Sequence, residues 1–175
     1  DNVDMIYILE KRENEFFISL NERGVILEYC KIRNKELAQL YFAIFVKRGV
    51  TDFEFPLMTL TNDIEDIEIL KEYLTREKLD DFYSVDSRVK GKINFSSELN
   101  KIYYIDASDN EYNLFSLPNR LFQTFYASIV KLKTIKEWLI QLNDANGLGD
   151  QYEATLLGYS LEGLIRSELF VIKEK

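Results

Sequence analysis

The spacing of apolar residues predicts one long helix late in the chain. Pro118 stands where a first helical residue is expected, because its missing N–H costs nothing there and its φ is already helical. Apolar residues then recur at helical spacing as far as Leu142, and no Gly or Pro interrupts the run before Gly147. The pattern predicts a central helix over about 118–143 that packs into the core. A homodimer that uses part of this helix face is an alternative.

The first part of the chain predicts an antiparallel meander followed by a helix. Runs rich in β-branched and aromatic residues cover 5–10, 15–20 and 25–31, and short polar segments between them suit hairpin turns. Asn34 is a natural N-cap and Gly49 a natural stop, so an amphipathic helix is predicted over 35–48.

The rest of the chain mixes short strands and helices. The segment 53–60 contains Pro56 and is expected to be an edge strand or extended, and Asn62 with Glu65 matches a capping box that opens a helix to about Lys78. Residues 80–92 are expected to be irregular. Further strands are predicted over 92–95, 101–105 and 111–115, and short helices over 150–157 and 161–170. Together these elements predict an α+β fold with a β-meander, further strands, four to five helices and one globular domain over 1–175.

Charge narrows the classes of partner. The net charge of −8 disfavours binding to nucleic acid or to an anionic membrane surface, because both require a basic face. It suits a basic partner protein, although it also serves solubility. The segment 62–81 is the most acidic stretch, with eight acidic and three basic residues. It supplies our candidate partner-binding residues, which are Asp63, Glu65, Asp66, Glu68, Glu72, Asp80 and Asp81. The alternative is a solvated helix face.

Several common catalytic groups are absent from the sequence. There is no histidine and only one cysteine, Cys30, which excludes histidine-based catalysis, thiolate zinc sites and an internal disulfide. Cys30 is expected to be a small buried residue in a strand, and a single cysteine suits the reducing cytoplasm. No phosphate-binding glycine loop occurs, so we expect no cofactor, no metal and no catalytic residue.

Carboxylates keep one enzymatic alternative open, a divalent-metal-dependent hydrolase or nuclease. Asp106, Asp109 and Glu111 surround one predicted hairpin loop and are the residues to consider for calcium. They lack the EF-hand spacing, so the favoured interpretation is a polar turn whose side chains bond to its own backbone.

The tail has the spacing of a helix-turn-helix but not its chemistry. Ala154, Gly158, Ser160 and Leu164 fall at the positions of the small residue, the turn glycine, the cap and the apolar anchor of that motif. The second predicted helix, however, carries more acidic than basic residues. DNA reading is therefore disfavoured.

The same tail, Leu156-Leu157-Gly158-Tyr159-Ser160 followed by Glu162, resembles that of small acidic bacterial immunity proteins. Such proteins bind and neutralise a cognate toxin domain, often a nuclease, in contact-dependent growth inhibition and bacteriocin systems. The resemblance implies a cytoplasmic, non-catalytic inhibitor with an acidic binding face. The alternatives are the metal-dependent hydrolase and a phage or accessory structural protein without a site.

Overall fold

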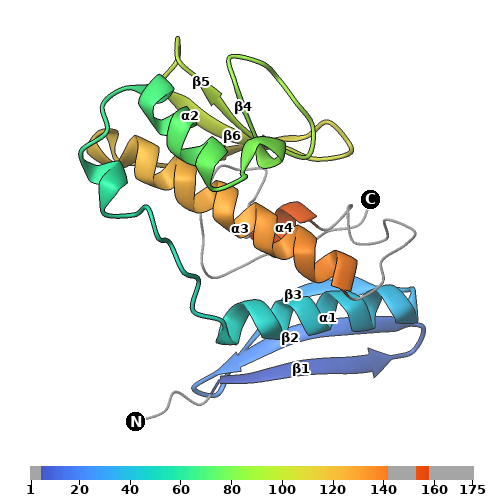
Figure 1. The fold of residues 1–175 in the computed structure, drawn as a ribbon. Coiled ribbons are helices and arrows are strands. Elements are labelled where there is room, and N and C mark those ends of the chain that lie inside the picture. The colour runs from blue at the N-terminus through green and yellow to red at the C-terminus, as the bar shows by residue number, and fades with distance from the viewer. Residues whose placement is uncertain (1–4, 142–152, 158–175) are drawn as a thin grey trace.

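A computed structural model describes residues 5–141 and 153–157 of this chain. The fold has two β-sheets at opposite ends with helices between them (Figure 1). The first sheet holds β1 (Met5–Arg12), β2 (Glu15–Glu22) and β3 (Val25–Ile32), and the second holds β4 (Tyr83–Val85), β5 (Ile93–Ser96), β6 (Lys101–Ile105) and β7 (Glu111–Leu114). The helices are α1 (Lys35–Val50), α2 (Ile67–Arg76), α3 (Leu121–Gln141) and α4 (Glu153–Leu157), with 3₁₀ turns η1 (Leu60–Asn62), η2 (Asp80–Phe82) and η3 (Pro118–Arg120). The predicted α+β class and N-terminal meander are confirmed.

The meander is closed by two tight turns. Both turns place residues at positive φ, with Glu13 in the first and Arg23 and Gly24 in the second. In the second turn, the Gly24 N–H donates to the Asn21 side chain at 2.9 Å. A register shift between Ile18 and Ser19 marks a bulge in the β2–β3 pairing. Such a bulge locally increases the twist of the sheet.

Helix α1 packs on one face of the meander. Asn34 caps the helix as predicted, because its side chain accepts from the Leu37 N–H at 2.9 Å. The predicted stop at Gly49 is wrong, since α1 runs on to Val50. Gly49 lies instead where the Tyr7 ring crosses the helix, and a Cβ there would be 2.6 Å from the ring carbon Cζ. The glycine therefore permits a close approach between sheet and helix.

The segment 53–60, predicted to be an edge strand or extended, contains no strand in the structure. Pro56 enters a turn that leads to η1, and the Leu57 N–H donates to the Tyr126 hydroxyl of α3 at 3.1 Å. The Leu57 N–H therefore has its hydrogen-bond partner in a side chain of α3. In a β-strand, the same N–H would donate to a carbonyl of the adjacent strand.

The start of α2 differs from the predicted capping box. Asn62 belongs to η1, and the helix begins only at Ile67. Asp66 is the N-cap, and its side chain accepts from the Glu68 N–H at 2.8 Å. The helix ends at Arg76, before the predicted Lys78. The apolar side of α2 behaves as predicted, with Leu70 fully buried in the core.

The second sheet contains a strand that the sequence pattern did not predict. Strand β4 lies within the expected irregular segment 80–92 and pairs in parallel with β5. The link between them is held by the buried side chain of Asn94, which accepts from the Val89 N–H at 2.8 Å and donates to the Val89 carbonyl at 3.0 Å. The other pairs, β5–β6 and β6–β7, are antiparallel, and the predicted hairpin between β6 and β7 is confirmed.

The long helix lies between the two sheets (Figure 1). Pro118 opens η3, and α3 then covers most of the predicted range 118–143. Towards the second sheet, Phe125 packs against Phe95 at 5.5 Å, and near its end Trp138 packs against Phe53 at 5.9 Å. Its buried residues are Phe125, Tyr126, Ser128, Ile129, Leu132, Ile135, Trp138 and Leu139. The predicted core role of this helix is confirmed.

Some predicted elements lie outside the described residues. The predicted end of the long helix at 142–143 and the helix over 161–170 are among them, while α4 falls within the helix predicted over 150–157. None of the described helices combines the length and the apolar character that crossing a membrane requires. The single-domain organisation over 1–175 stays a prediction.

Candidate functional site

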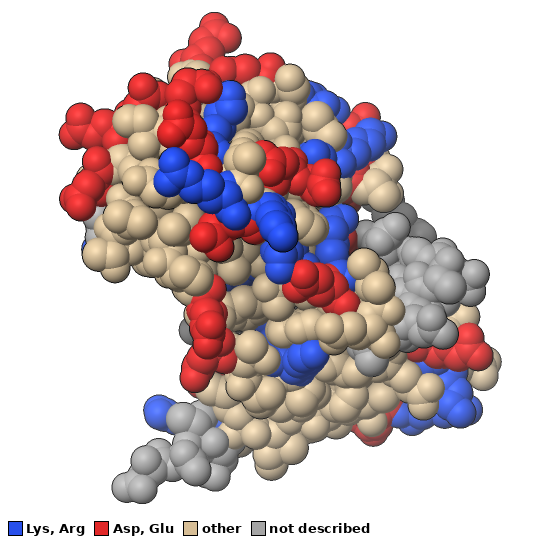
Figure 2. Space-filling model, viewed as in Figure 1, with Lys and Arg blue, Asp and Glu red and all other residues tan. Residues whose placement is uncertain are grey.

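The seven predicted partner-binding residues all lie on the surface around α2. We call them the acidic surface, and each is exposed. Figure 2 shows carboxylates gathered at the upper left of the molecule, the region that α2 and its flanking segments occupy in Figure 1. These side chains are therefore accessible to a partner, while binding by them stays a prediction.

Helix α2 divides the acidic surface into two groups. Asp63, Glu65, Asp66 and Glu68 surround the start of the helix, and Asp80 and Asp81 follow its end in η2. Ten helical residues at about 1.5 Å each separate the two groups by about 15 Å. Glu72 lies between them on the exposed side of the helix. The structure therefore brings together the first four residues and sets the last two apart.

Three members of the acidic surface have local partners. Asp66 caps α2, and Glu68 pairs with Lys71 at 2.8 Å. The Thr75 hydroxyl donates to an Asp80 carboxylate oxygen at 2.7 Å. These contacts fix the side chains and partly neutralise Glu68.

The other four carboxylates carry uncompensated charge. Among the described residues, no lysine or arginine nitrogen lies within ion-pair distance of Asp63, Glu65, Glu72 or Asp81. Exposed negative charge of this kind attracts a basic surface over a distance of about 8–10 Å at physiological salt.

An apolar residue lies within the acidic surface, and sequence reasoning missed it. Ile69 is 47% exposed on α2, although its neighbours Leu70 and Ile67 turn towards the core. Helical spacing places Ile69 beside Glu72, whereas Glu65 precedes the N-cap Asp66 and lies outside the helix. An exposed apolar side chain on a helix that is flanked by carboxylates can serve as an interface anchor with a polar rim. The signal was present in the sequence as an apolar residue off the core stripe of the helix.

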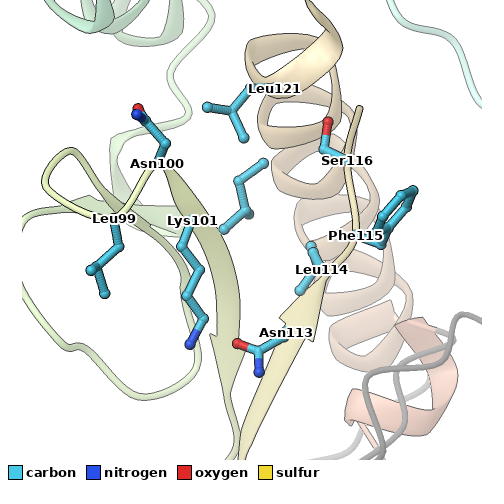
Figure 3. A pocket seen from close by; sticks show the side chains of 9 residues that line it. Leu99, Asn100, Lys101, Asn113, Leu114, Phe115, Ser116 and Leu121 are labelled. Carbon is cyan, nitrogen blue, oxygen red and sulfur yellow. The ribbon is translucent and has the colours of Figure 1, made fainter. Parts of the chain in front are cut away.

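A second surface feature is a hollow of about 380 Å³ at the open end of the β6–β7 hairpin (Figure 3). Leu99 and Phe115 on its rim are 67% and 69% exposed, and Leu121 closes it from the start of α3. Its lining includes Lys101 but no carboxylate, and none of the seven acidic residues. The hollow can accept a neutral apolar side chain, but it does not provide acidic surroundings for a basic partner.

The carboxylates considered for calcium do not converge. The buried carboxylate of Asp106 accepts from the Asn110 N–H at 2.8 Å, the Asn110 side-chain amide at 2.9 Å and the Tyr112 hydroxyl at 2.9 Å. Asp109 instead faces Arg88, whose hydrogen bond lowers the pKa of that carboxyl, and Glu111 pairs with Lys101 at 2.6 Å. Within the described part of the chain, no group of acidic, histidine or cysteine side chains is placed to hold a metal ion.

One more carboxylate is buried among polar groups. Glu153 of α4 is 2% exposed, accepts a hydrogen bond from the Tyr104 hydroxyl, and lies 2.9 Å from Lys136 Nζ through its other oxygen. These groups belong to three different elements. Because the carboxylate is enclosed, a substrate cannot reach it in this conformation, and its contacts connect α4 to the core.

Comparison with known proteins does not assign this chain to a family. No protein-family model, no curated protein and no solved structure matches this chain. The tail motif that resembles immunity proteins begins in α4 at Leu156 and Leu157, but Gly158, Tyr159, Ser160 and Glu162 lie outside the described residues. The second helix of the suggested helix-turn-helix lies outside them as well.

Proposed function

We propose that this protein is a non-catalytic inhibitor that binds a basic partner, most specifically an immunity protein that neutralises a cognate toxin domain such as a nuclease. The observation that carries the proposal is the acidic surface, where four carboxylates have no basic partner among the described residues and Glu72 lies one helical turn from the exposed side chain of Ile69. The net charge of −8 and the tail resemblance support it. A toxin of this type acts inside the cell, so the proposal also places the protein in the cytoplasm.

The mechanism follows from charge and shape. A nuclease cleft is lined by lysine and arginine because it holds phosphates. Asp63, Asp66, Glu68 and Glu72 would enter the field of such a cleft and steer the encounter. Ile69 would then be buried at the centre of the contact, and the substrate would be excluded from the cleft. No chemistry on the inhibitor is required.

The test uses the toxin domain encoded beside the gene of this chain, with binding measured calorimetrically. Replacing Glu65→Lys together with Glu72→Lys should weaken binding at least about tenfold, because two attractions become repulsions. The control, Glu13→Lys with Glu98→Lys, makes the same change in net charge at exposed positions elsewhere. It should change affinity by only about twofold.

The salt dependence of binding and the effect of Ile69→Ala test the electrostatic and the apolar parts of the proposal separately. Affinity for the toxin domain should fall steeply between low and high salt, and Ile69→Ala should weaken it at high salt as well. Binding that does not depend on salt would contradict the electrostatic mechanism. Equal effects of the two charge-reversal pairs would show that the acidic surface is not the binding site.

A further inference from the structure

The three strands of the meander contain consecutive apolar residues instead of a clean alternation. The runs Met5–Leu9, Phe16–Ile18 and Val25–Leu27 each place apolar residues on both faces of the sheet. Such runs are typical of strands that are covered on both sides. In the described structure, the helix that packs on this sheet is α1, on one face.

The register identifies the residues of the other face. Tyr7 points towards α1, where it meets Phe45 at 5.6 Å, so its neighbours Ile6 and Ile8 point away. Residues that pair across neighbouring strands point to the same face. Glu10, which shares the face of Ile8, pairs with Phe17. Asn21 pairs with Ile6 on one side and with Ile26 on the other, so Phe17 and Ile26 belong to this face too. We call Ile6, Ile8, Phe17 and Ile26 the outer face.

The four outer-face residues lie outside the core, Ile8 and Phe17 are half-buried, and the small Ser19 opposite Ile8 is buried. Tyr7, Leu9 and Phe16 of the inner face pack against the core, whereas no residue of the outer face does. Ile6 is 56% exposed and Ile26 is 61% exposed. Adjacent exposed apolar side chains of this kind mark an interaction surface. Met5 and Val25 are also exposed at this end of the sheet, but alternation along the strands places them on the face of Tyr7.

The charge of the meander indicates which partner suits this face. Residues 5–33 contain five acidic and five basic residues and are neutral, so the rest of the chain carries the whole net charge of −8. The charged groups beside the outer face also neutralise one another, because Arg12 pairs with Glu10 at 2.8 Å and with Glu28 at 3.1 Å. The Arg12 guanidinium lies over the Phe17 ring, 4.5 Å from its centre.

A neutral face offers no attraction to the basic partner of the acidic surface. Because it is neutral, however, two copies of this acidic chain can meet on it without like-charge repulsion. We propose that the outer face of the meander binds the outer face of a second copy of this chain, so that two three-stranded sheets pack face to face across a two-fold axis. This inference does not rest on the proposed function.

The size of the face sets the expected strength. Eight residues at about 3.3 Å give strands about 26 Å long, and three strands about 4.8 Å apart give a narrow sheet. The contact is therefore smaller than the roughly 800 Å² per partner of a standard interface. We expect a reversible dimer with a dissociation constant of about 1–100 µM.

Sedimentation velocity of the full chain from about 5 to 500 µM tests the proposal. The wild-type protein should shift from monomer to dimer over this range, and the shift should persist or strengthen at high salt because burial of apolar surface drives it. Ile26→Lys and Ile6→Lys should each weaken the dimer at least tenfold, because each dimer would then contain two like charges at its interface. Ile26→Thr, which keeps a β-branched side chain, should weaken it less.

Leu99→Lys is the matched control, because Leu99 is equally exposed but lies beside the second sheet. It should leave the dimer unchanged, and circular dichroism should show that every variant is folded. A wild-type monomer at 500 µM would overturn the proposal. So would a dimer that survives both lysine substitutions in folded protein, or one that dissociates as salt is raised.

Discussion

Lys136 Nζ of α3 lies 2.9 Å from Glu153 Oε2 of α4, and the carboxylate of this pair is almost completely buried. The other carboxylate oxygen of Glu153 accepts from the Tyr104 hydroxyl of β6. One side chain thus connects the short helix to both the long helix and the second sheet. A buried carboxylate needs this surrounding of donors, since without it the cost of desolvation would exceed any gain from packing.

Glu153→Ala should lower the free energy of unfolding by about 2–3 kcal/mol, because Lys136 and the buried Tyr104 hydroxyl both lose this acceptor. Urea unfolding followed by Trp138 fluorescence measures the loss. Glu137→Ala is the control, since its exposed pair with Lys133 at 2.6 Å should contribute less than about 0.5 kcal/mol. Equal losses would show that burial does not strengthen the Lys136–Glu153 contact.

Lys131 should destabilise the folded protein at neutral pH. Burial, and then the nearby charge of Arg48, lower the pKa of Lys131 from its ordinary value of 10.5. The unfolded chain therefore holds this proton more tightly than the folded chain, and the charged lysine opposes folding. Lys131→Met should raise the free energy of unfolding at pH 7 by up to about 1 kcal/mol.

The advantage of Lys131→Met should shrink with pH. Between the lowered pKa of the folded state and 10.5, Lys131 loses its proton in the folded protein but keeps it in the unfolded chain. The free-energy cost of burying a charged lysine is then removed. Urea unfolding of both proteins between pH 7 and 10 measures this trend. Lys133→Met, at the exposed pair with Glu137, should give no such gain. A gain from Lys131→Met that does not change with pH would indicate better packing in place of a relieved charge.

Gly49→Ala should destabilise the contact between α1 and the meander. The added Cβ would collide with the Tyr7 ring, so the ring or the helix must shift at a cost of about 1–3 kcal/mol. The collision is tested by a double-mutant cycle with Tyr7→Ala, measured by urea unfolding. In the Tyr7→Ala background, Gly49→Ala should be neutral or stabilising, because alanine favours a helix. Additive losses would show that the two residues do not interact.

The Asp106 loop should behave as a hydrogen-bonded turn. Asp106→Ala removes the acceptor for three donors in a buried setting and should cost about 2 kcal/mol in unfolding free energy. Asp109→Asn, which loses only its exposed pairs with Arg88 and Lys90, should leave the unfolding free energy almost unchanged. Calcium at millimolar concentration should leave the melting temperature unchanged. A rise in melting temperature that Asp106→Ala abolishes would instead support a metal site.

The elements that sequence could predict are those with a strong local signal. The cap at Asn34 and the strands of the meander follow from side-chain type and periodicity within a few residues. Strand β4 could not be predicted in this way, because three residues show no period and their pairing with β5 depends on the distant Asn94 side chain. Asn62 and Asp66 are equally good caps in sequence, and the turn at η1 decides between them.

The candidate site was predictable in its charge but not in its arrangement. Acidic residues around an amphipathic helix are expected to be exposed, and those around α2 are. Their division into two groups depends on where α2 begins and ends, and the exposure of Ile69 depends on how the helix is rotated against α3. The role of Gly49 likewise required the position of Tyr7, a residue more than 40 positions earlier in the chain.

The position of α3 between the two sheets has a consequence for synthesis of the chain. Its buried residues pack against β5 of the second sheet and against α1, yet they are translated after all seven described strands. At about 5–20 residues per second, the ribosome needs roughly 5 to 20 seconds between Ile32 and Gln141. During this interval the apolar faces that α3 will cover remain open on the nascent chain. Chaperones that bind exposed apolar segments therefore have a defined window in which to act.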